Sequence, residues 1–324
     1  MNARIPMIVF AVSLLFTVAM WAYFSQLTAT RQQRQFDAEC DALHERLDAR
    51  FSEVTTLLGS LQRMFAGYVE VVPDVFQLSV AIPGSTTPGV RVLGFSPRLR
   101  YDDLPGYITY ARQVISPRFY IVPEGKRDMY HPLEFIAPQE AQPSLLGFDV
   151  SSDSAVQAVV GGMTPAGPVC ATRQLRLGPL EDSVVVFLVP VSFRVDSAGR
   201  ASRGGIDGLC MALVEVDALV RAALTFSYDS TRIAFSILDS DGSVLFRSTS
   251  DGGDATSVRK LRVADREWSI HFARQRAFLI GSDGSGVHLT MLIGLLFSVL
   301  LSTTVWLLLR RSVVPAAGAT FHQQ

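Results

Sequence analysis

The segment IPMIVFAVSLLFTVAMWAYFSQL, residues 5–27, contains no Asp, Glu, Lys or Arg, and neither does VHLTMLIGLLFSVLLSTTVWLLL, residues 287–309. Each covers about 23 residues, which is long enough for a helix to cross roughly 30 Å of hydrocarbon. The residues between them have a composition compatible with water. The sequence therefore predicts two transmembrane helices that enclose a soluble domain.

Basic residues next to the two spans predict the orientation. Arg4 precedes the first span, and Arg310 and Arg311 follow the second, which favours a cytoplasmic location for both ends. Further arginines just beyond the first span reduce this bias. A cleaved signal peptide is the alternative for the amino terminus, but the apolar core is long and no A-x-A-like site closes it. We expect a two-pass protein of the bacterial inner membrane, with cytoplasmic tails at 1–4 and 310–324 and a periplasmic or otherwise extracytoplasmic domain.

The composition excludes several classes of protein. Apolar residues make up 48% of the chain, the formal net charge is −1, and no basic block of the kind that binds nucleic acid is present. The three cysteines, Cys40, Cys170 and Cys210, show no CxxC spacing, which argues against a zinc site. In an oxidising compartment Cys170 and Cys210 either form a disulfide or are buried as small apolar side chains. We expect no metal, no cofactor and no nucleic acid partner.

Residues 28–72 predict a long stalk helix, because apolar side chains recur there in alternating steps of four and three. Two interpretations of this apolar seam stay open. Heptad spacing favours pairing with a second copy in a homodimer, in which two Cys40 thiols would approach each other, whereas an ordinary amphipathic helix packs on its own domain. The dimer interpretation places these residues at the interface: Phe36, Cys40, Leu43, Leu47 and Val54.

Residues 73–276 alternate β-like runs with helical stretches at 101–116, 154–161 and 217–224. The β-like runs are rich in β-branched and aromatic residues and are bounded by Gly, Pro, Asp or Ser. Because strands and helices do not alternate regularly, the pattern predicts an α+β fold with antiparallel sheets. The expected strands cover residues 90–95, 118–122, 183–191, 209–216, 233–238, 244–247, 259–263 and 268–273.

A Gly, Ser and Arg-rich stretch at 196–207 predicts a boundary between two subdomains. The larger, membrane-distal subdomain would span residues 73–200 and the smaller, membrane-proximal one residues 201–276. A linker at 277–286 would lead to the second membrane span. Between two expected strands, the sequence DSDGS at 239–243 predicts a tight hairpin turn.

The order of several motifs resembles the CHASE domain. After the stalk come PGVRVLGFSPRL at 88–99, DMYHPLEFIAP at 128–138 and LGFDVSSD at 146–153, followed by VVVFLVPV at 184–191 and a closing WSIHFA at 268–273. The CHASE domain is the extracytoplasmic ligand-sensing domain of plant cytokinin receptor kinases and of many bacterial histidine kinases and diguanylate cyclases. The likeness extends over most of the soluble region.

The resemblance implies two PAS-like subdomains after the stalk helix, with a ligand in the membrane-distal one. In the plant receptors an aspartate at the position of Asp149 hydrogen-bonds a purine ligand, and a following strand supplies further contacts. That strand corresponds here to Ala171 and Thr172. Aromatic side chains suit the apolar walls of such a pocket, and we expect this role of Phe95, Phe135 and Phe148.

Each of these residues also has an ordinary structural interpretation. Asp149 has the sequence context of a cap for the helix at 154–161, or of a turn residue beside Ser151 and Ser152. Phe95 and Phe135 lie in strand-like runs, where aromatic side chains usually pack in the core. The segment after Gly167 departs from the plant pattern, so the pocket volume and the ligand are expected to differ.

The sequence gives little support for catalysis. It contains no G-x-S-x-G, P-loop, H-E-x-x-H or G-x-G-x-x-G motif in a suitable context, and its five histidines are scattered without ligand spacing. We therefore expect a sensor that is not an enzyme. Its ligand would be a small molecule, a planar nitrogen heterocycle or a small polar metabolite, and a separate cytoplasmic kinase or cyclase would receive the signal. The alternative is a non-signalling envelope protein with a structural or docking role.

Overall fold

The computed structural model describes residues 4–66, 73–138, 143–180, 182–193, 205–224, 228, 232–248, 256–275 and 284–311. The predicted linker at 277–286 and boundary stretch at 196–207 fall largely outside these residues, as do most of the two predicted tails. The chain divides into two compact units. One unit comprises Met1–Glu39 with Gln275–Gln324, and the other comprises Cys40–Arg274.

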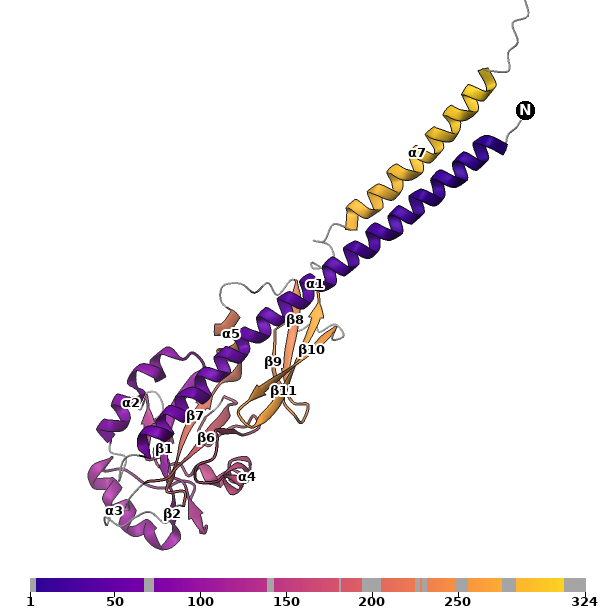
Figure 1. Cartoon of the computed structure of the whole chain (residues 1–324). Helices are drawn as coiled ribbons and strands as arrows, with labels where there is room; N and C mark the ends of the chain where they lie inside the picture. Colours follow the sequence, from indigo (N-terminus) through magenta and orange to yellow (C-terminus); the bar gives the residue numbers. More distant parts are fainter. Residues whose placement is uncertain are drawn as a thin grey trace, which may run out of the picture. The chain divides into compact units, whose positions relative to one another are not determined.

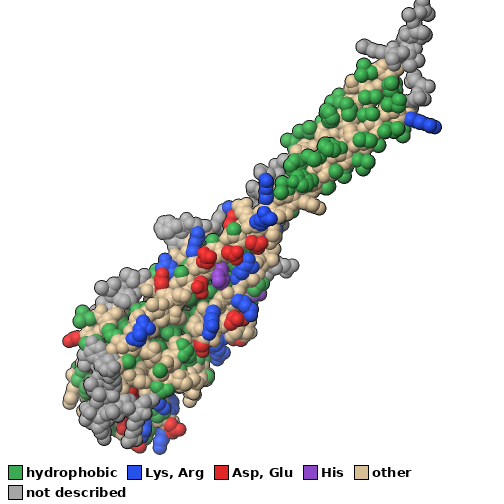
Figure 2. Space-filling view, viewed as in Figure 1, with side chains coloured by type: hydrophobic (Ala, Val, Ile, Leu, Met, Phe, Trp, Pro, Cys, Tyr) green, Lys and Arg blue, Asp and Glu red, His purple; other side chains and the backbone are tan. Residues whose placement is uncertain are grey.

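The first unit contains the amino-terminal half of helix α1 (Arg4–Phe65) and the whole of α7 (Gly284–Arg311). Both helices contain a stretch that is long and apolar enough to cross a membrane. Figure 2 shows hydrophobic side chains over the visible face of these two helices. They meet through small polar side chains: the hydroxyls of Thr17 and Ser298 lie 3.5 Å apart, and Ser302 donates to the carbonyl of Pro6 at 3.2 Å. Small residues permit such close approach of membrane helices.

In the second unit the rest of α1 lies along two antiparallel sheets (Figure 1). Phe51 contacts Trp268 edge to face with ring centroids 5.1 Å apart, and Phe65 contacts Phe95 at 6.1 Å. The five predicted interface side chains, Phe36, Cys40, Leu43, Leu47 and Val54, are at most 6% exposed in the single chain. This corrects their interpretation as a dimer interface, because a second copy cannot contact side chains that are already buried. The seam is an amphipathic stripe that packs within its own chain.

The larger sheet has the strand order β4-β1-β7-β6-β5, with every neighbouring pair antiparallel. β6 and β7 are buried at every residue, as expected of strands covered on both faces. The strands are β1 (Val90–Pro97), β4 (Phe135–Ala137), β5 (Cys170–Ala171), β6 (Val185–Val191) and β7 (Gly208–Val214).

β7 corrects the predicted boundary between the subdomains. It lies in the middle of the larger sheet, and its Gly208 pairs with Val191 of β6. The Gly and Ser-rich stretch therefore connects two neighbouring strands of one sheet, and the smaller sheet begins only at Ile233. Composition alone does not distinguish a long hairpin connection from a linker between domains, since both are rich in the same residues.

The smaller sheet has the order β10-β11-β8-β9 and is also antiparallel. Its strands are β8 (Ile233–Leu238), β9 (Val244–Arg247), β10 (Ser257–Val263) and β11 (Arg266–Arg274). The predicted tight turn between β8 and β9 is confirmed, with Gly242 at a φ of 83° and its N–H donating to the carbonyl of Asp239. The α+β class with antiparallel sheets is likewise confirmed.

Helices and two short strands complete the domain. Helix α2 was not expected from the sequence, and the run at 118–122 expected to be a strand forms only an isolated bridge at Val122. The remaining elements are α2 (Pro73–Thr86), β2 (Leu99–Arg100), η1 (Tyr101–Asp103), α3 (Leu104–Val114), β3 (Met129–Tyr130), η2 (Pro143–Leu145), η3 (Val150–Ser152), α4 (Ser154–Gly162) and α5 (Val216–Leu224).

The cysteines do not form a disulfide. Cys170 and Cys210 are both free, as is Cys40. Cys210 lies in β7 with no exposed surface, and burial raises the pKa of its thiol well above the usual value. For Cys210 the structure therefore supports the second of the two alternatives, a buried small apolar side chain.

Candidate functional site

A cavity of about 450 Å³ lies beside α4 in the unit Cys40–Arg274. This volume falls within the usual range for small-molecule sites. Its lining combines charged, polar and apolar side chains. The lining residues are Arg98, Arg127, Asp128, Met129, His131, Ser151, Gln157, Val160, Gly161, Met163 and Ile206.

Two local structures position the residues that line the cavity. β2 pairs with β3 through Leu99 and Tyr130, which places Arg98 near the segment that contains Asp128 and His131. Helix α4 forms another wall. It begins after Asp153, whose carboxylate accepts hydrogen bonds from the N–H groups of Ala155 and Val156 at 2.8 and 3.4 Å. Such a cap satisfies N–H groups that the first helical turn leaves without partners.

The face of α4 that lines the cavity follows helical spacing. Gln157, Val160 and Gly161 lie three and four positions apart and therefore share one side of the helix. Gly162, the next residue, does not line the cavity. A Cβ atom built on either glycine would meet nothing within 4 Å. The two glycines thus differ in their relation to the cavity but not in local crowding.

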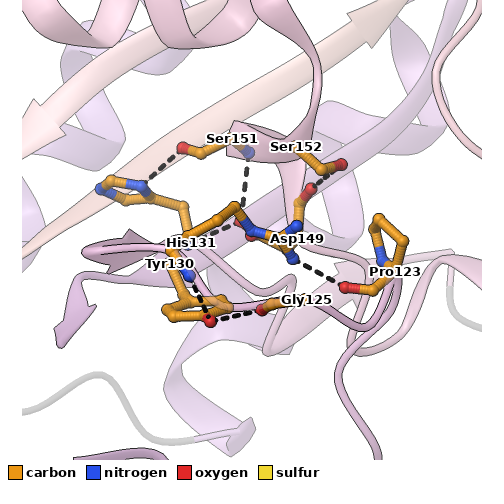
Figure 3. Close-up of polar contacts among 8 residues, drawn as sticks. Pro123, Gly125, Tyr130, His131, Asp149, Ser151 and Ser152 are labelled. Atoms are coloured by element: carbon orange, nitrogen blue, oxygen red, sulfur yellow. Dashed lines mark hydrogen bonds and ion pairs between the residues drawn. The ribbon is translucent and has the colours of Figure 1, made fainter. Parts of the chain in front are cut away.

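Asp149 has no exposed surface and does not line the cavity. Its carboxylate accepts from Arg127 Nε at 2.9 Å, from the N–H of His131 at 2.9 Å and from the N–H of Ser151 at 3.1 Å (Figure 3). Ser152 donates its hydroxyl to the Asp149 carbonyl. Of the alternatives left open by the sequence, the turn residue beside the two serines is correct, and Asp153 caps α4 instead.

Arg127 holds the loop before β3 in place. Its Nη2 donates to the carbonyl of Pro123 at 2.7 Å, and its guanidinium lies over the ring of Tyr130, 5.0 Å from the ring centre. The Tyr130 hydroxyl accepts from the Arg127 N–H and donates to the carbonyl of Gly125 at 2.6 Å. The Arg127 charge is therefore compensated by Asp149 and fixed by several contacts.

His131 is the most unusual group at the cavity. It is 2% exposed, its Nδ1 lies 2.7 Å from the hydroxyl of Ser151, and its Nε2 is buried without a hydrogen-bond partner among the described residues. Figure 3 shows the imidazole beside Ser151. Burial, followed by the positive charge of Arg98, lowers the pKa of His131 to about 4. His131 is therefore neutral near pH 7.

The other predicted site residues belong to the core. Phe95 and Phe135 stack with ring centroids 6.1 Å apart, and Phe148 belongs to the hydrophobic cluster of the larger sheet. Thr172 is buried, and its hydroxyl accepts from the N–H of Val186 at 3.0 Å; Ala171 is 1% exposed. None of these five side chains lines the cavity, so the structure assigns them ordinary packing roles.

Sequence reasoning did not single out the residues that do line the cavity. Arg98 and His131 lie inside the motifs that carry the family resemblance, but nothing in those motifs predicts that these two side chains line a cavity. Their proximity depends on the pairing of β2 with β3, two-residue strands too short to leave a periodic signal. Within the described residues no group of His, Cys, Asp and Glu side chains could hold a metal ion.

Comparisons with solved structures find distant likenesses to receptors and to their sensory or ligand-binding domains. The periplasmic sensory domain of a Campylobacter jejuni chemoreceptor is 10% identical, with 74% of this chain and 93% of that chain covered and a TM-score of 0.47. The ligand-binding domain of a Pseudomonas fluorescens chemoreceptor, solved with L-alanine, is 10% identical with a TM-score of 0.44, covering 76% of this chain and 98% of that one.

An extracellular ligand-binding receptor from Desulfohalobium retbaense gives a TM-score of 0.48 at 10% identity and 74% coverage of this chain. The match covers 40% of that receptor's length. No curated protein sequence matches the chain significantly.

A family comparison is decisive. Residues 76–249, more than half of the chain, match the CHASE domain, from within α2 to just after β9. This confirms the resemblance found in the order of the sequence motifs, and the chain belongs to the CHASE-domain family of extracellular sensors.

Proposed function

We propose that this chain is a membrane-anchored sensor whose distal cavity binds a small molecule outside the cell and whose helices transmit the binding event across the membrane. The observation that carries the proposal is the cavity itself. It has the volume of a small-molecule site, and both apolar side chains and several polar groups line it. We propose further that both termini lie in the cytoplasm, where a kinase or cyclase receives the signal.

The end of α4 offers a route from the cavity to the stalk. α4 lines the cavity, and the segment that follows it includes Gly167, whose carbonyl accepts from Gln62 Nε2 of α1 at 3.1 Å. The same amide group donates to the carbonyl of Pro190 in β6 at 2.9 Å. A shift of α4 on ligand binding would therefore change hydrogen bonds made directly by the stalk helix.

A second link leads to the smaller sheet. The N–H of Ala171 in β5 donates to the carboxylate of Asp265, in the turn between β10 and β11, at 2.7 Å. β11 ends at Arg274, shortly before α7. In this proposal these links have two arrangements, and the ligand binds one of them more tightly. The ligand can shift the equilibrium between the two arrangements by no more than the difference between its binding free energies for them. Homodimerisation stays a prediction, without the stalk seam as its interface.

Two neighbouring glycines provide the test. We expect Gly161→Trp to place an indole in the cavity, whereas Gly162→Trp adds the same side chain outside it; both positions have free space. The full-length protein in detergent would be screened by thermal unfolding against a library of metabolites. A true ligand at a hundredfold excess over its Kd should stabilise the wild type by about 2.7 kcal/mol.

The expected result is that the ligand stabilises the wild type and Gly162→Trp but not Gly161→Trp. A ligand that stabilises all three proteins equally would place binding outside this cavity and contradict the proposal. Failure of every compound in a broad metabolite library to stabilise the wild type would also count against a sensory role for the cavity.

A further inference from the structure

The charges around the cavity divide into compensated and uncompensated groups. Arg127 forms an ion pair with buried Asp149 at 2.9 Å, so its charge is neutralised within the protein. Arg98 forms no ion pair within the described part of the chain, and the only hydrogen bond of its guanidinium there is a 3.5 Å contact to the carbonyl of Ile206. Asp128 likewise has no ion-pair partner among the described residues. One cation and one carboxylate are therefore free to contact a ligand.

His131 adds a polar group without adding charge. Its lowered pKa of about 4 leaves the imidazole neutral near pH 7, and one ring nitrogen is already engaged with Ser151. The other nitrogen, Nε2, is buried and has no partner in the described structure. A buried polar atom without a partner costs free energy, which a ligand that reaches it would recover.

From this arrangement we propose that the cavity binds a free amino acid, with the carboxylate of the ligand at Arg98 and its ammonium group at Asp128. The inference rests on the proposed sensory function and names the ligand class. The uncompensated charges at the cavity sum to zero but have both signs, which matches a zwitterion better than a simple anion or cation. Charge-assisted hydrogen bonds to both ends of the ligand would then supply orientation as well as affinity.

The apolar lining residues indicate which side chain the ligand carries. Met129, Val160, Met163 and Ile206 line the cavity without any further charged group. Methionine is flexible and polarisable, so two methionines can adapt to side chains of different shape. The site therefore favours an aliphatic amino acid such as leucine.

The position of Asp149 argues against a planar nitrogen heterocycle held as in the plant receptors. That mode requires a carboxylate with a free acceptor facing the ligand, but Asp149 is fully buried and already accepts three hydrogen bonds. The carboxylate exposed at the cavity is Asp128, which comes from a different element.

The first test compares L-leucine with the two analogues that each lack one charged group, 4-methylpentanoate and 3-methylbutylamine. Binding to the full-length protein in detergent would be measured by calorimetry after a thermal-shift screen of the twenty standard L-amino acids. We expect the best amino acid to bind at least about tenfold tighter than either of its single-charge analogues, since each lost charge-assisted hydrogen bond is worth about that factor. An analogue that binds as well as the amino acid would overturn the proposal.

The second test changes the two free charges. Asp128→Asn and Arg98→Gln should each weaken amino acid binding by about tenfold, the lower end for charged hydrogen bonds because both side chains are exposed. Asp128→Asn should also reduce the preference for the amino acid over the carboxylic acid. The matched controls are Glu124→Gln and Arg100→Gln, which remove exposed charges nearby that do not line the cavity.

The outcomes separate this inference from the proposed function. If no amino acid binds, but another compound stabilises the wild type and not Gly161→Trp, the sensory function stands and the amino acid assignment is wrong. If an amino acid binds equally well to Gly161→Trp and the wild type, both proposals fail. Unchanged affinity in both Asp128→Asn and Arg98→Gln would also remove the proposed contacts.

Discussion

The two antiparallel sheets of the soluble unit differ in how their strands are connected. In the smaller sheet β8 and β9 are joined through a tight turn at Asp239, and β10 and β11 through Ala264 and Asp265. In the larger sheet β1 and its neighbour β4 are separated by residues 98–134, which contain β2, β3 and α3. The cavity is built mainly from these long connections and from α4, rather than from the strands of the sheet.

Burial shows the same contrast. β6 and β7 are buried at every residue, whereas in β10 exposed positions alternate with half-buried or buried ones. The larger sheet is covered on both faces, with α1 and α2 among the elements that contact it, while the smaller sheet has a face more open to solvent. The comparison teaches that long connections on a rigid sheet create the candidate site, and short ones leave a scaffold.

The largest expected effect on stability comes from removing the carboxylate of either of two buried ion pairs. Asp149 pairs with Arg127 beside the cavity, and Asp239 pairs with Arg266 at the smaller sheet; both carboxylates are at most 1% exposed. Asp149→Ala and Asp239→Ala should each lower the free energy of unfolding by about 3 to 5 kcal/mol, because each leaves an arginine and N–H groups without their acceptor.

Ligand binding should distinguish the two variants. Asp149→Ala releases Arg127 beside the cavity and adds a second free cation, so it should change ligand preference toward anions as well as stability. Asp239→Ala should affect stability alone. Denaturant unfolding and calorimetry on the full-length protein measure both properties. Unchanged ligand preference in Asp149→Ala would show that Arg127 does not face the ligand.

A somewhat smaller effect on the free energy of unfolding is expected at acid pH. The pKa of His131 is about 4 in the folded protein and about 6.5 when unfolded, so between these values the unfolded chain binds a proton that the folded chain does not. Stability should therefore fall as the pH is lowered from 6.5 to 4, by about 3 kcal/mol from this group, and His131 should contribute no pH dependence above that window.

The measurement is the unfolding free energy as a function of pH for wild type and His131→Gln, with His271→Gln in the smaller sheet as the control. His131→Gln should flatten the curve between pH 6.5 and 4. If the wild type and His131→Gln curves run parallel, the histidine is already solvated in the folded protein.

The smallest effect on stability is expected at the link between the stalk helix α1 and the region of the larger sheet. Gln62→Met removes the donor for the carbonyls of Gly167 and Pro190 and should cost about 1 kcal/mol, because water can replace part of the interaction at this half-buried site. Ligand affinity should persist, whereas the response of the stalk to ligand, followed by hydrogen exchange, should weaken. Thr56→Ala on the exposed side of the same helix is the control; equal responses in both variants would exclude Gln62 from the route.

Much of the fold was predictable because it depends on local patterns. The apolar spans, the periodic stalk seam and the tight turn at residues 239–243 each involve neighbouring residues, and each predicted element is present. Predictions failed where a pattern has two structural meanings. The stalk seam has the heptad spacing of a coiled coil but packs within its own chain, and the Gly and Ser-rich stretch before Gly208 connects two strands of one sheet.

The sequence by itself determined the family, the two apolar helices and the α+β class, since residue order and hydrophobic periodicity are written directly along the chain. Only the tertiary structure decided the site. Arg98 and His131 are separated by more than thirty residues, and the burial of Asp149 beneath Arg127 depends on how a loop folds over η3. Charges acquire partners through space, so only the folded chain shows that Arg98 and Asp128 have no ion-pair partner among the described residues.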